Sequence, residues 1–445
     1  MLAQREKNAP AATWFGQVAK ARGASDAFFA ALGRLQSEAQ RGGSKRAENQ
    51  DQALRLDSRA RRLAAWPEVE SAWATLRPRL MGIAKVAGEA ASRYIIGGGG
   101  RVAVASDGIA TDLIGAQRRI ETLCKQVDQA MSATSSGSVY WVRQPYVPQN
   151  RRNGQPSSTR QRDEDVPATG ELSGMYAGHV EVGGLVGSLT GPRHGLVLVG
   201  SALAAGGDFE YACGTLGLYP SDTHTLSAAA ARDDQTLLVL PEDAAEPNAS
   251  SYQRQLDDML AGLSARLGGR VVAIFPSHAA LRAASVGIKQ HLEKQDVLVL
   301  AQGIDGSQRQ LWQTFRSQAR VVLLGAGGFW DGIEMEGTAP ACVVVTRLPF
   351  PSLSDPLLAA RAELWQDHQN QFVVPYAALR LRQALNGLAW SHQQRNAVVL
   401  FDRRVVSREY GPSILATLPH CTVRHEPLDH LVDQVAAWVD TDGRG

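Results

Sequence analysis

The sequence predicts an α/β protein in which a mostly helical amino-terminal part precedes a domain built on a parallel β-sheet. Two observations support this prediction. From about residue 180 onwards, short runs of Val, Leu and Ile recur between turn residues, and helical segments separate several of them. From about residue 10 to 135, apolar residues instead recur at the three- and four-residue spacing of helices.

The apolar runs are expected to be strands buried on both faces, because they contain almost no polar residue. They are 196–199, 237–240, 271–275, 297–300, 321–324, 343–345 and 398–401. Apolar positions at helical spacing predict helices between them over 252–267, 281–292 and 376–388. An earlier run, SVYWV at 138–142, is also expected to form a strand.

Three helices are predicted before residue 137. Their apolar positions run through 28–35, 66–80 and 113–130, and Pro67 is expected in the first turn of the second helix. Four arginines on the other faces are interpreted as a solvated surface rather than a nucleic-acid track: Arg55, Arg59, Arg61 and Arg62. The run Gly97–Gly100 lacks the lysine of a phosphate-binding P-loop and is interpreted as a bend between helices.

The composition is that of an ordinary soluble protein with little net charge. The 445 residues carry a formal charge of +2, so any nucleic-acid binding has to come from local patches. The four cysteines are far apart, which indicates neither a disulfide framework nor a zinc ribbon and favours a reducing compartment. Neither a signal peptide nor a membrane span is recognisable, so a cytoplasmic location and no membrane partner are expected.

A glycine-rich loop follows the run at 321–324. Gly325, Gly327 and Gly328 come directly after the apolar residues, and the aromatic pair Phe329 and Trp330 follows. This order is typical of a buried strand that ends in a ligand-facing loop at the carboxyl edge of a parallel sheet. The aromatic pair has two interpretations, packing in the core or stacking on bases, and packing is favoured.

Acidic residues in the same loop leave a second choice open. Asp331, Glu334 and Glu336 are candidates for acid–base chemistry or metal binding. Hydrogen bonding to the backbone N–H groups of a tight turn is an equally good interpretation. The histidines lack ligand spacing to cysteines or acids, and Ser201 lacks the second glycine of a nucleophile elbow.

Several segments resemble the DinG/XPD-type superfamily 2 DNA helicases. VVLLGAGGFWDGIEMEG at 321–337 is similar to the family's motif V, G-T-x-S-F-W-E-G-V-D-x-x-G, and TRLPFPSLSDPL at 346–357 is similar to its K-L-P-F-P-x-P-x-D-P segment. Residues 196–218 resemble the motif III region, which begins T-S-A-T-L and ends F-x-x-x-x-x-x-L-G-L. Residues 271–282 resemble motif IV, residues 302–316 resemble the segment between motifs IV and V, and residues 381–411 resemble motif VI with its following strand. Together these segments cover roughly residues 139–425.

The resemblance implies a RecA-like helicase carboxy-terminal lobe preceded by a helical Arch-like domain. The expected boundaries are 1–137 for the Arch-like domain, 138–235 for a remnant of the first helicase lobe with an exposed loop at 149–167, and 236–445 for the RecA-like domain. The residues expected to remain from the nucleotide cleft are Gly325, Asp331, Gly332, Glu334 and Gln383. The candidate nucleic-acid contacts are Ser277, Gln302, Phe329, Trp330, Arg403 and Arg404.

The departures from the family pattern concern the catalytic machinery. The 445 residues contain neither a Walker A motif nor a DEAH box, and no four clustered cysteines for an iron–sulfur cluster. The family's Q-x-x-G-R-x-x-R pattern keeps Gln383, but Gly387 and Trp390 stand where its two arginines are expected. Positioned charges of this kind account for most of the rate of phosphoryl transfer, so no ATP hydrolysis by this chain alone is expected.

Two functions are therefore predicted as alternatives. In the first, the chain is the carboxy-terminal portion of a DinG-like helicase acting in DNA repair, and it uses ATP and magnesium only when a separately encoded P-loop lobe is supplied in trans. In the second, it is a catalytically inactive module that binds single-stranded DNA or a protein, from a decayed or truncated helicase paralogue. Single-stranded DNA is the expected ligand, and no iron–sulfur cluster is expected.

Overall fold

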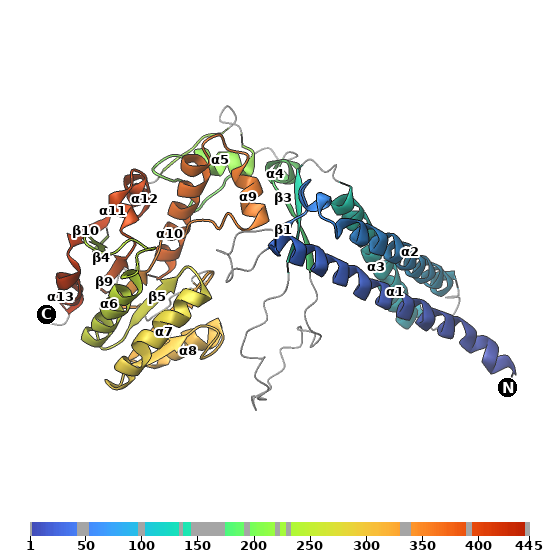
Figure 1. Cartoon of the computed structure of the whole chain (residues 1–445), viewed down its shortest axis with the longest axis horizontal. Helices are drawn as coiled ribbons and strands as arrows, with labels where there is room; N and C mark the ends of the chain where they lie inside the picture. Colours follow the sequence, from blue (N-terminus) through green and yellow to red (C-terminus); the bar gives the residue numbers. More distant parts are fainter. Residues whose placement is uncertain are drawn as a thin grey trace. The chain divides into compact units, whose positions relative to one another are not determined.

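The protein divides into two compact units, shown in Figure 1. The computed structural model describes residues 2–41, 53–96, 103–132, 137–143, 174–190, 196–218, 223–227, 233–329, 340–388 and 394–440. Unit 1 comprises Met1–Glu181 and Ser352–Arg361, and unit 2 comprises Val182–Pro351 and Ala362–Gly445. None of the helices in these described ranges is both long and apolar enough to cross a membrane.

Unit 1 is built on the three helices that the sequence predicts. They are α1 (Leu2–Arg41), α2 (Trp66–Ile96) and α3 (Ala103–Met131), with the short 3-10 helix η2 (Ala60–Arg62) before α2. Their apolar faces form one core, in which Leu32 of α1, Val69 and Trp73 of α2 and Val127 of α3 are buried. Pro67 lies in the first turn of α2, where its missing N–H removes no helical hydrogen bond.

A small antiparallel sheet completes unit 1. Its strands are β1 (Leu54–Arg55), β2 (Ser138–Arg143) and β3 (Gly174–His179), in the order β1-β2-β3. The strand predicted at 138–142 is thus confirmed as β2. Tyr140 and Val142 point from one face of the sheet into the core of the helices, so the sheet and helices share that core. The helix α9 (Pro356–Ala362) contributes Leu357, whose methyl groups would lie 3.0 Å from a Cβ on Gly178.

One of the four arginines interpreted as solvated has a structural role instead. The guanidinium of Arg61 donates a 2.9 Å hydrogen bond to the backbone oxygen of Ala130 at the carboxyl end of α3. The same group lies 4.8 Å from the ring centre of Trp66. Burial lowers the pKa of Arg61 from its usual value. Arg61 therefore terminates α3 and ties it to the start of α2.

Unit 2 contains a seven-stranded parallel sheet with the strand order β10-β4-β9-β8-β5-β7-β6. The strands are β4 (Asp233–Pro241), β5 (Val271–Phe275), β6 (Leu298–Ala301), β7 (Val321–Ala326), β8 (Cys342–Val345), β9 (Asn396–Leu400) and β10 (Cys421–Glu426). All but one of the predicted apolar runs form strands of this sheet. β10, which the sequence analysis missed, lies at the edge of the sheet, and among the described strands it pairs with β4 alone.

Helices cover both faces of the sheet, which is why its strands are apolar on both sides. One core packs beneath α6 (Tyr252–Arg266), α7 (His278–Glu293) and α13 (Leu428–Asp440). The other packs beneath α8 (Gln308–Ser317), α10 (Val374–Leu388) and α12 (Gly411–Thr417). The remaining helices are α4 (Gly183–Thr190), α5 (Glu210–Leu216), the π-helix η5 (Gln369–Val373) and α11 (Arg404–Ser407). This confirms the predicted α/β class with a RecA-like parallel sheet.

The strand predicted at 196–199 is wrong. This segment has no strand conformation, and no described strand pairs with it. Val197 and Val199 are 83% and 92% exposed. Four consecutive apolar residues have the pattern of a buried strand, but a strand also needs a partner to complete its backbone hydrogen bonds.

Candidate functional site

The carboxyl ends of the parallel strands of unit 2 form the edge at which a binding site is expected. The helices after β4 and β5 cover one face of the sheet, whereas α10 after β8 and α12 after β9 cover the other. Neighbouring strands whose connections leave to opposite faces create a crevice at their carboxyl ends, and ligands of open α/β sheets bind in such crevices. The pairs β4–β9 and β8–β5 meet this condition.

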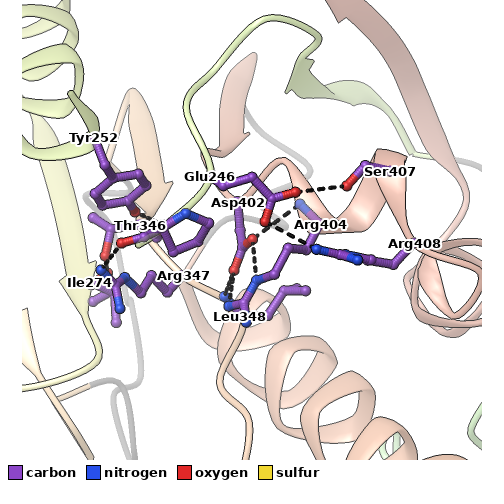
Figure 2. A network of polar contacts seen from close by, with 11 residues as sticks. Glu246, Tyr252, Ile274, Thr346, Arg347, Leu348, Asp402, Arg404, Ser407 and Arg408 are labelled. Atoms are coloured by element: carbon purple, nitrogen blue, oxygen red, sulfur yellow. Dashed lines mark hydrogen bonds and ion pairs between the residues drawn. The ribbon is translucent and has the colours of Figure 1, made fainter. Parts of the chain in front are cut away.

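A buried carboxylate organises the loops after β8 and β9 (Figure 2). Asp402 follows β9 directly, and its side chain is completely buried. One oxygen accepts a 2.9 Å hydrogen bond from the backbone N–H of Leu348, in the loop after β8. The other accepts hydrogen bonds from the backbone N–H and from Nε of Arg404, at 3.1 and 2.8 Å. Asp402 therefore holds both loops to each other.

Arg404 is the counter-ion of Asp402. Its second guanidinium nitrogen lies 2.6 Å from the Asp402 carboxylate, and the guanidinium lies 5.2 Å from the ring centre of Phe350. The hydrogen bond to Asp402 raises the pKa of Arg404 above its usual value. The sequence analysis proposed Arg404 as a phosphate contact, but in the structure its charge is engaged by Asp402. Because a guanidinium that compensates a buried carboxylate is costly to remove, the pairing with Asp402 fixes the position of Arg404, and its contact with phosphate remains a prediction.

A second set of contacts ties the loop after β8 to β5 and α6 (Figure 2). The hydroxyl of Thr346 donates a 2.9 Å hydrogen bond to the backbone oxygen of Ile274 on β5. The hydroxyl of Tyr252, at the start of α6, donates to the backbone oxygen of Thr346. Burial raises the pKa of Tyr252 to about 12. The guanidinium of Arg347 lies 5.0 Å from the ring centre of Tyr252.

An outer, exposed pair closes this network. Glu246, in the loop after β4, accepts hydrogen bonds of 3.4 Å from both Arg408 and Ser407 (Figure 2). Arg408 and Glu246 are 54% and 40% exposed, so their ion pair adds little to stability. The network thus has short hydrogen bonds around the buried Asp402 and longer, exposed ones at Glu246. Its polar groups bond to one another, which suits a scaffold that positions loops better than an acid–base active site.

Three of the predicted contact residues lie at this edge, after strands that are not adjacent to one another. Ser277, after β5, is exposed and caps α7 by accepting a 3.2 Å hydrogen bond from the backbone N–H of Ala280. Gln302, after β6, is half-buried and accepts a 2.9 Å hydrogen bond from the backbone N–H of Ala326 at the end of β7. Arg403, after β9, is exposed beside Asp402. Their role in binding nucleic acid remains a prediction.

Phe329 cannot serve as a base-stacking residue. Its side chain is fully buried and stacks on Trp312 of α8, with ring centres 5.3 Å apart and an interplanar angle of 22°. Of the two interpretations of Phe329, core packing and base stacking, the structure therefore shows core packing. Gly325 is needed for this packing, because a Cβ at that position would lie 2.0 Å from the Phe329 ring. The sequence signal was the glycine itself, which permits a close approach to the strand.

The other predicted cleft residues are placed only in part. Trp330, Asp331, Gly332 and Glu334 lie outside the described residues. Gln383 is exposed on α10. Among the residues that the structure describes, no group of three or more His, Cys, Asp or Glu side chains is arranged to hold a metal ion. The assignment of these residues to a nucleotide cleft remains a prediction.

Comparison with known proteins identifies the carboxy-terminal part of the chain. Residues 260–421 match the family described as "Helicase C-terminal domain". The ATP-dependent DNA helicase YoaA of Haemophilus influenzae is 28% identical over 50% of this chain and 35% of its own length. The 3'-5' exonuclease DinG of Bacillus subtilis is 27% identical over 56% of this chain and 28% of its own length. The carboxy-terminal region is a DinG-type helicase C-terminal domain.

This identification confirms, for that region, the family resemblance predicted from the motif V and motif VI segments. The matched residues include β5 to β9 and the loops that carry Ser277, Gln302 and Arg403. The chain spans about a third of the length of these curated relatives. A solved structure, "Structure of S. tokodaii Xpd4", aligns with 46% of this chain and 42% of its own length at 12% identity and a TM-score of 0.34.

Proposed function

We propose that this chain binds single-stranded nucleic acid through the carboxyl edge of its DinG-type helicase C-terminal domain. The observation that carries the proposal is the scaffold around Asp402, which fixes the loops of the matched domain and leaves Arg403 exposed at their surface. Ser277 and Gln302 lie in the loops after β5 and β6, at the same edge of the sheet, and add polar groups for a sugar–phosphate backbone. The relatives' names, which describe a DNA helicase and an exonuclease, favour a nucleic acid as the ligand.

ATP-dependent unwinding belongs to this proposal only in the presence of a complementing lobe. The 445 residues hold no Walker A motif and no DEAH box, so a P-loop lobe supplied in trans would have to provide the phosphate and magnesium sites. ATP and magnesium are then the cofactors, and an iron–sulfur cluster is not one of them. A role in DNA repair and a cytoplasmic location follow from the same family.

A second candidate is a binding module without turnover, acting on single-stranded DNA or on a protein. The observation that favours it is the replacement of the two motif VI arginines by Gly387 and Trp390. An arginine that stabilises the transition state is worth about 10³- to 10⁵-fold in the rate of phosphoryl transfer. Even a complemented assembly therefore needs these charges from another source.

Two assays on the purified chain test the proposal. Fluorescence anisotropy with a labelled oligo(dT) should show binding that weakens as salt rises, because phosphate contacts release counterions. Arg403→Ala should weaken binding, whereas Arg266→Ala, an exposed arginine paired with Asp440 near the opposite edge, should not. No ATPase activity is expected from the chain alone, with or without the oligonucleotide.

The outcomes separate the two functions from each other. Absence of any salt-sensitive association would overturn the binding proposal. ATPase activity of the isolated chain that single-stranded DNA stimulates would overturn the claim that it is catalytically incomplete. If a separate P-loop lobe restores DNA-stimulated ATPase activity, the helicase function is favoured over the module without turnover.

A further inference from the structure

The sheet of unit 1 presents a row of three side chains on the face that points away from the helices. Arg55 of β1 is directly opposite Trp141 of β2, which in turn is directly opposite Tyr176 of β3. Directly opposed residues of antiparallel strands lie on the same face of a sheet. The next row, Leu54, Val142 and Met175, packs into the core.

The two aromatic rings of this row are stacked and partly open to solvent. Trp141 and Tyr176 have ring centres 5.8 Å apart and an interplanar angle of 13°. Tyr176 is 46% exposed, although it is one of the large side chains that usually gain most from burial. The stack is therefore an aromatic surface that the described part of unit 1 does not cover completely.

Gly174 of β3 makes room for the Tyr176 ring, because a Cβ at that position would lie 2.8 Å from it. A Cβ on Gly178 would lie 3.0 Å from Leu357 of α9 and 3.4 Å from the Trp141 ring. These two glycines flank Tyr176 on the same face of the strand. Glycine in a strand costs stability, and at Gly174 it lets the Tyr176 ring lie across the strand.

Basic side chains surround the stack. Arg55 lies in the aromatic row, and Arg143 is two residues after Trp141 on the same face. Arg143 is 37% exposed, although its Nε is buried, and a guanidinium nitrogen lies 3.9 Å from Asp355, which is a long and weak ion pair. Arg361, on α9, donates a 3.2 Å hydrogen bond to the backbone oxygen of His179 at the end of β3.

We propose that this face is a stacking platform for the bases of a single-stranded nucleic acid, with Trp141 and Tyr176 stacking on bases and Arg55 and Arg143 facing phosphates. An aromatic stack on a sheet with two arginines on the same face matches the alternation of flat bases and anionic phosphates in a strand. The inference rests on the proposed function because the ligand is the same, but the platform belongs to unit 1, and its strands β1, β2 and β3 lie outside the matched residues 260–421.

The test uses the full chain and two labelled strands of equal length, oligo(dT) and an abasic strand that has phosphates but no bases. Tyr176→Ala should weaken oligo(dT) binding by about 5- to 150-fold, the loss expected for one stacked base. Binding of the abasic strand should not change, because its phosphate contacts remain. Tyr176→Phe is the matched control: it keeps the ring and should bind oligo(dT) as the unmodified chain does.

Two further measurements complete the test. Arg143→Ala should weaken both strands and reduce the slope of log affinity against log salt by about 0.7, the value for one phosphate contact of a single strand. In the unmodified chain, photocrosslinking to an iodouracil-substituted strand should label Trp141 or Tyr176, a readout that does not depend on the folding of any variant.

The outcomes distinguish this inference from the proposed function. If oligo(dT) binds and Arg403→Ala weakens it, while Tyr176→Ala binds normally and no crosslink forms on β2 or β3, the platform is refuted and the proposed function stands. If Tyr176→Ala weakens both strands equally, stacking is refuted. If the unmodified chain binds neither strand, both proposals fall.

Discussion

Replacing Asp402 should destabilise unit 2 more than any other single change of a polar residue at the carboxyl edge. Asp402→Ala removes a buried acceptor of four hydrogen bonds, one from Leu348 and three from Arg404. Removing one member of a buried ion pair typically costs about 3–5 kcal/mol. Arg404 is 26% exposed, so water can reach its guanidinium in part, and a loss near the lower limit is expected.

Backbone hydrogen exchange in β8 and β9 measures this loss, because amides at the centre of a sheet exchange through global unfolding of their unit. The expected loss of protection corresponds to about 3 kcal/mol for Asp402→Ala, and to about 2 kcal/mol for Asp402→Asn, which keeps the shape and loses the charge. Asp258→Ala is the matched control, since this α6 carboxylate is 76% exposed and its loss should stay within about 0.5 kcal/mol. A change below about 1 kcal/mol for Asp402→Ala would show that Asp402 does not hold these loops.

Two other substitutions test the packing of unit 2 and its response to pH. Gly325→Ala should lower the free energy of unfolding by about 1–3 kcal/mol, because its Cβ would lie 2.0 Å from the Phe329 ring. Gly82→Ala in α2 is the control: a Cβ there has no atom within 4 Å, so this variant should be neutral or stabilising. Equal thermal midpoints for the two variants would contradict the prediction. Burial raises the pKa of Asp257 from 3.8 to about 6, so its carboxyl group binds a proton more tightly in the folded than in the unfolded protein. The free energy of unfolding should therefore fall as pH rises from about 4 to 6. Asp257→Asn should raise the urea midpoint at pH 7 and reduce the loss of stability between about pH 4 and 6. An unchanged dependence of stability on pH would show that Asp257 does not cause this loss.

The strands of unit 2 were predictable because a parallel sheet covered on both faces needs continuous apolar runs. The same rule failed at 196–199, where the run is apolar but no described strand pairs with it. It also missed β10, whose sequence CTVRHE mixes polar residues with apolar ones because an edge strand is less buried. Composition thus indicates which segments are able to be strands, while pairing depends on contacts that are distant in sequence.

The candidate site was less predictable than the fold. The segment FDRR predicted that Arg403 and Arg404 contact phosphates, yet Arg404 is paired with the buried carboxylate of Asp402, and Arg403 is the more exposed of the two. Neither the burial of Asp402 nor its bond to Leu348 has a local sequence signal, because the partner is 54 residues away. Trp141 was predicted within a strand, but its stack with Tyr176 depends on the register of β2 and β3.

The most direct test of the central claim is hydrogen exchange of the whole chain with and without a single-stranded oligonucleotide at low salt. Binding at the carboxyl edge of unit 2 should slow exchange in the loops after β5, β6 and β9, at about residues 276–278, 302–306 and 402–408, and leave the opposite edge around 268–270 and 294–297 unchanged. Raising the salt concentration should remove the protection as the complex dissociates. Protection confined to other parts of the chain, or none under conditions where the oligonucleotide is bound, would contradict the account.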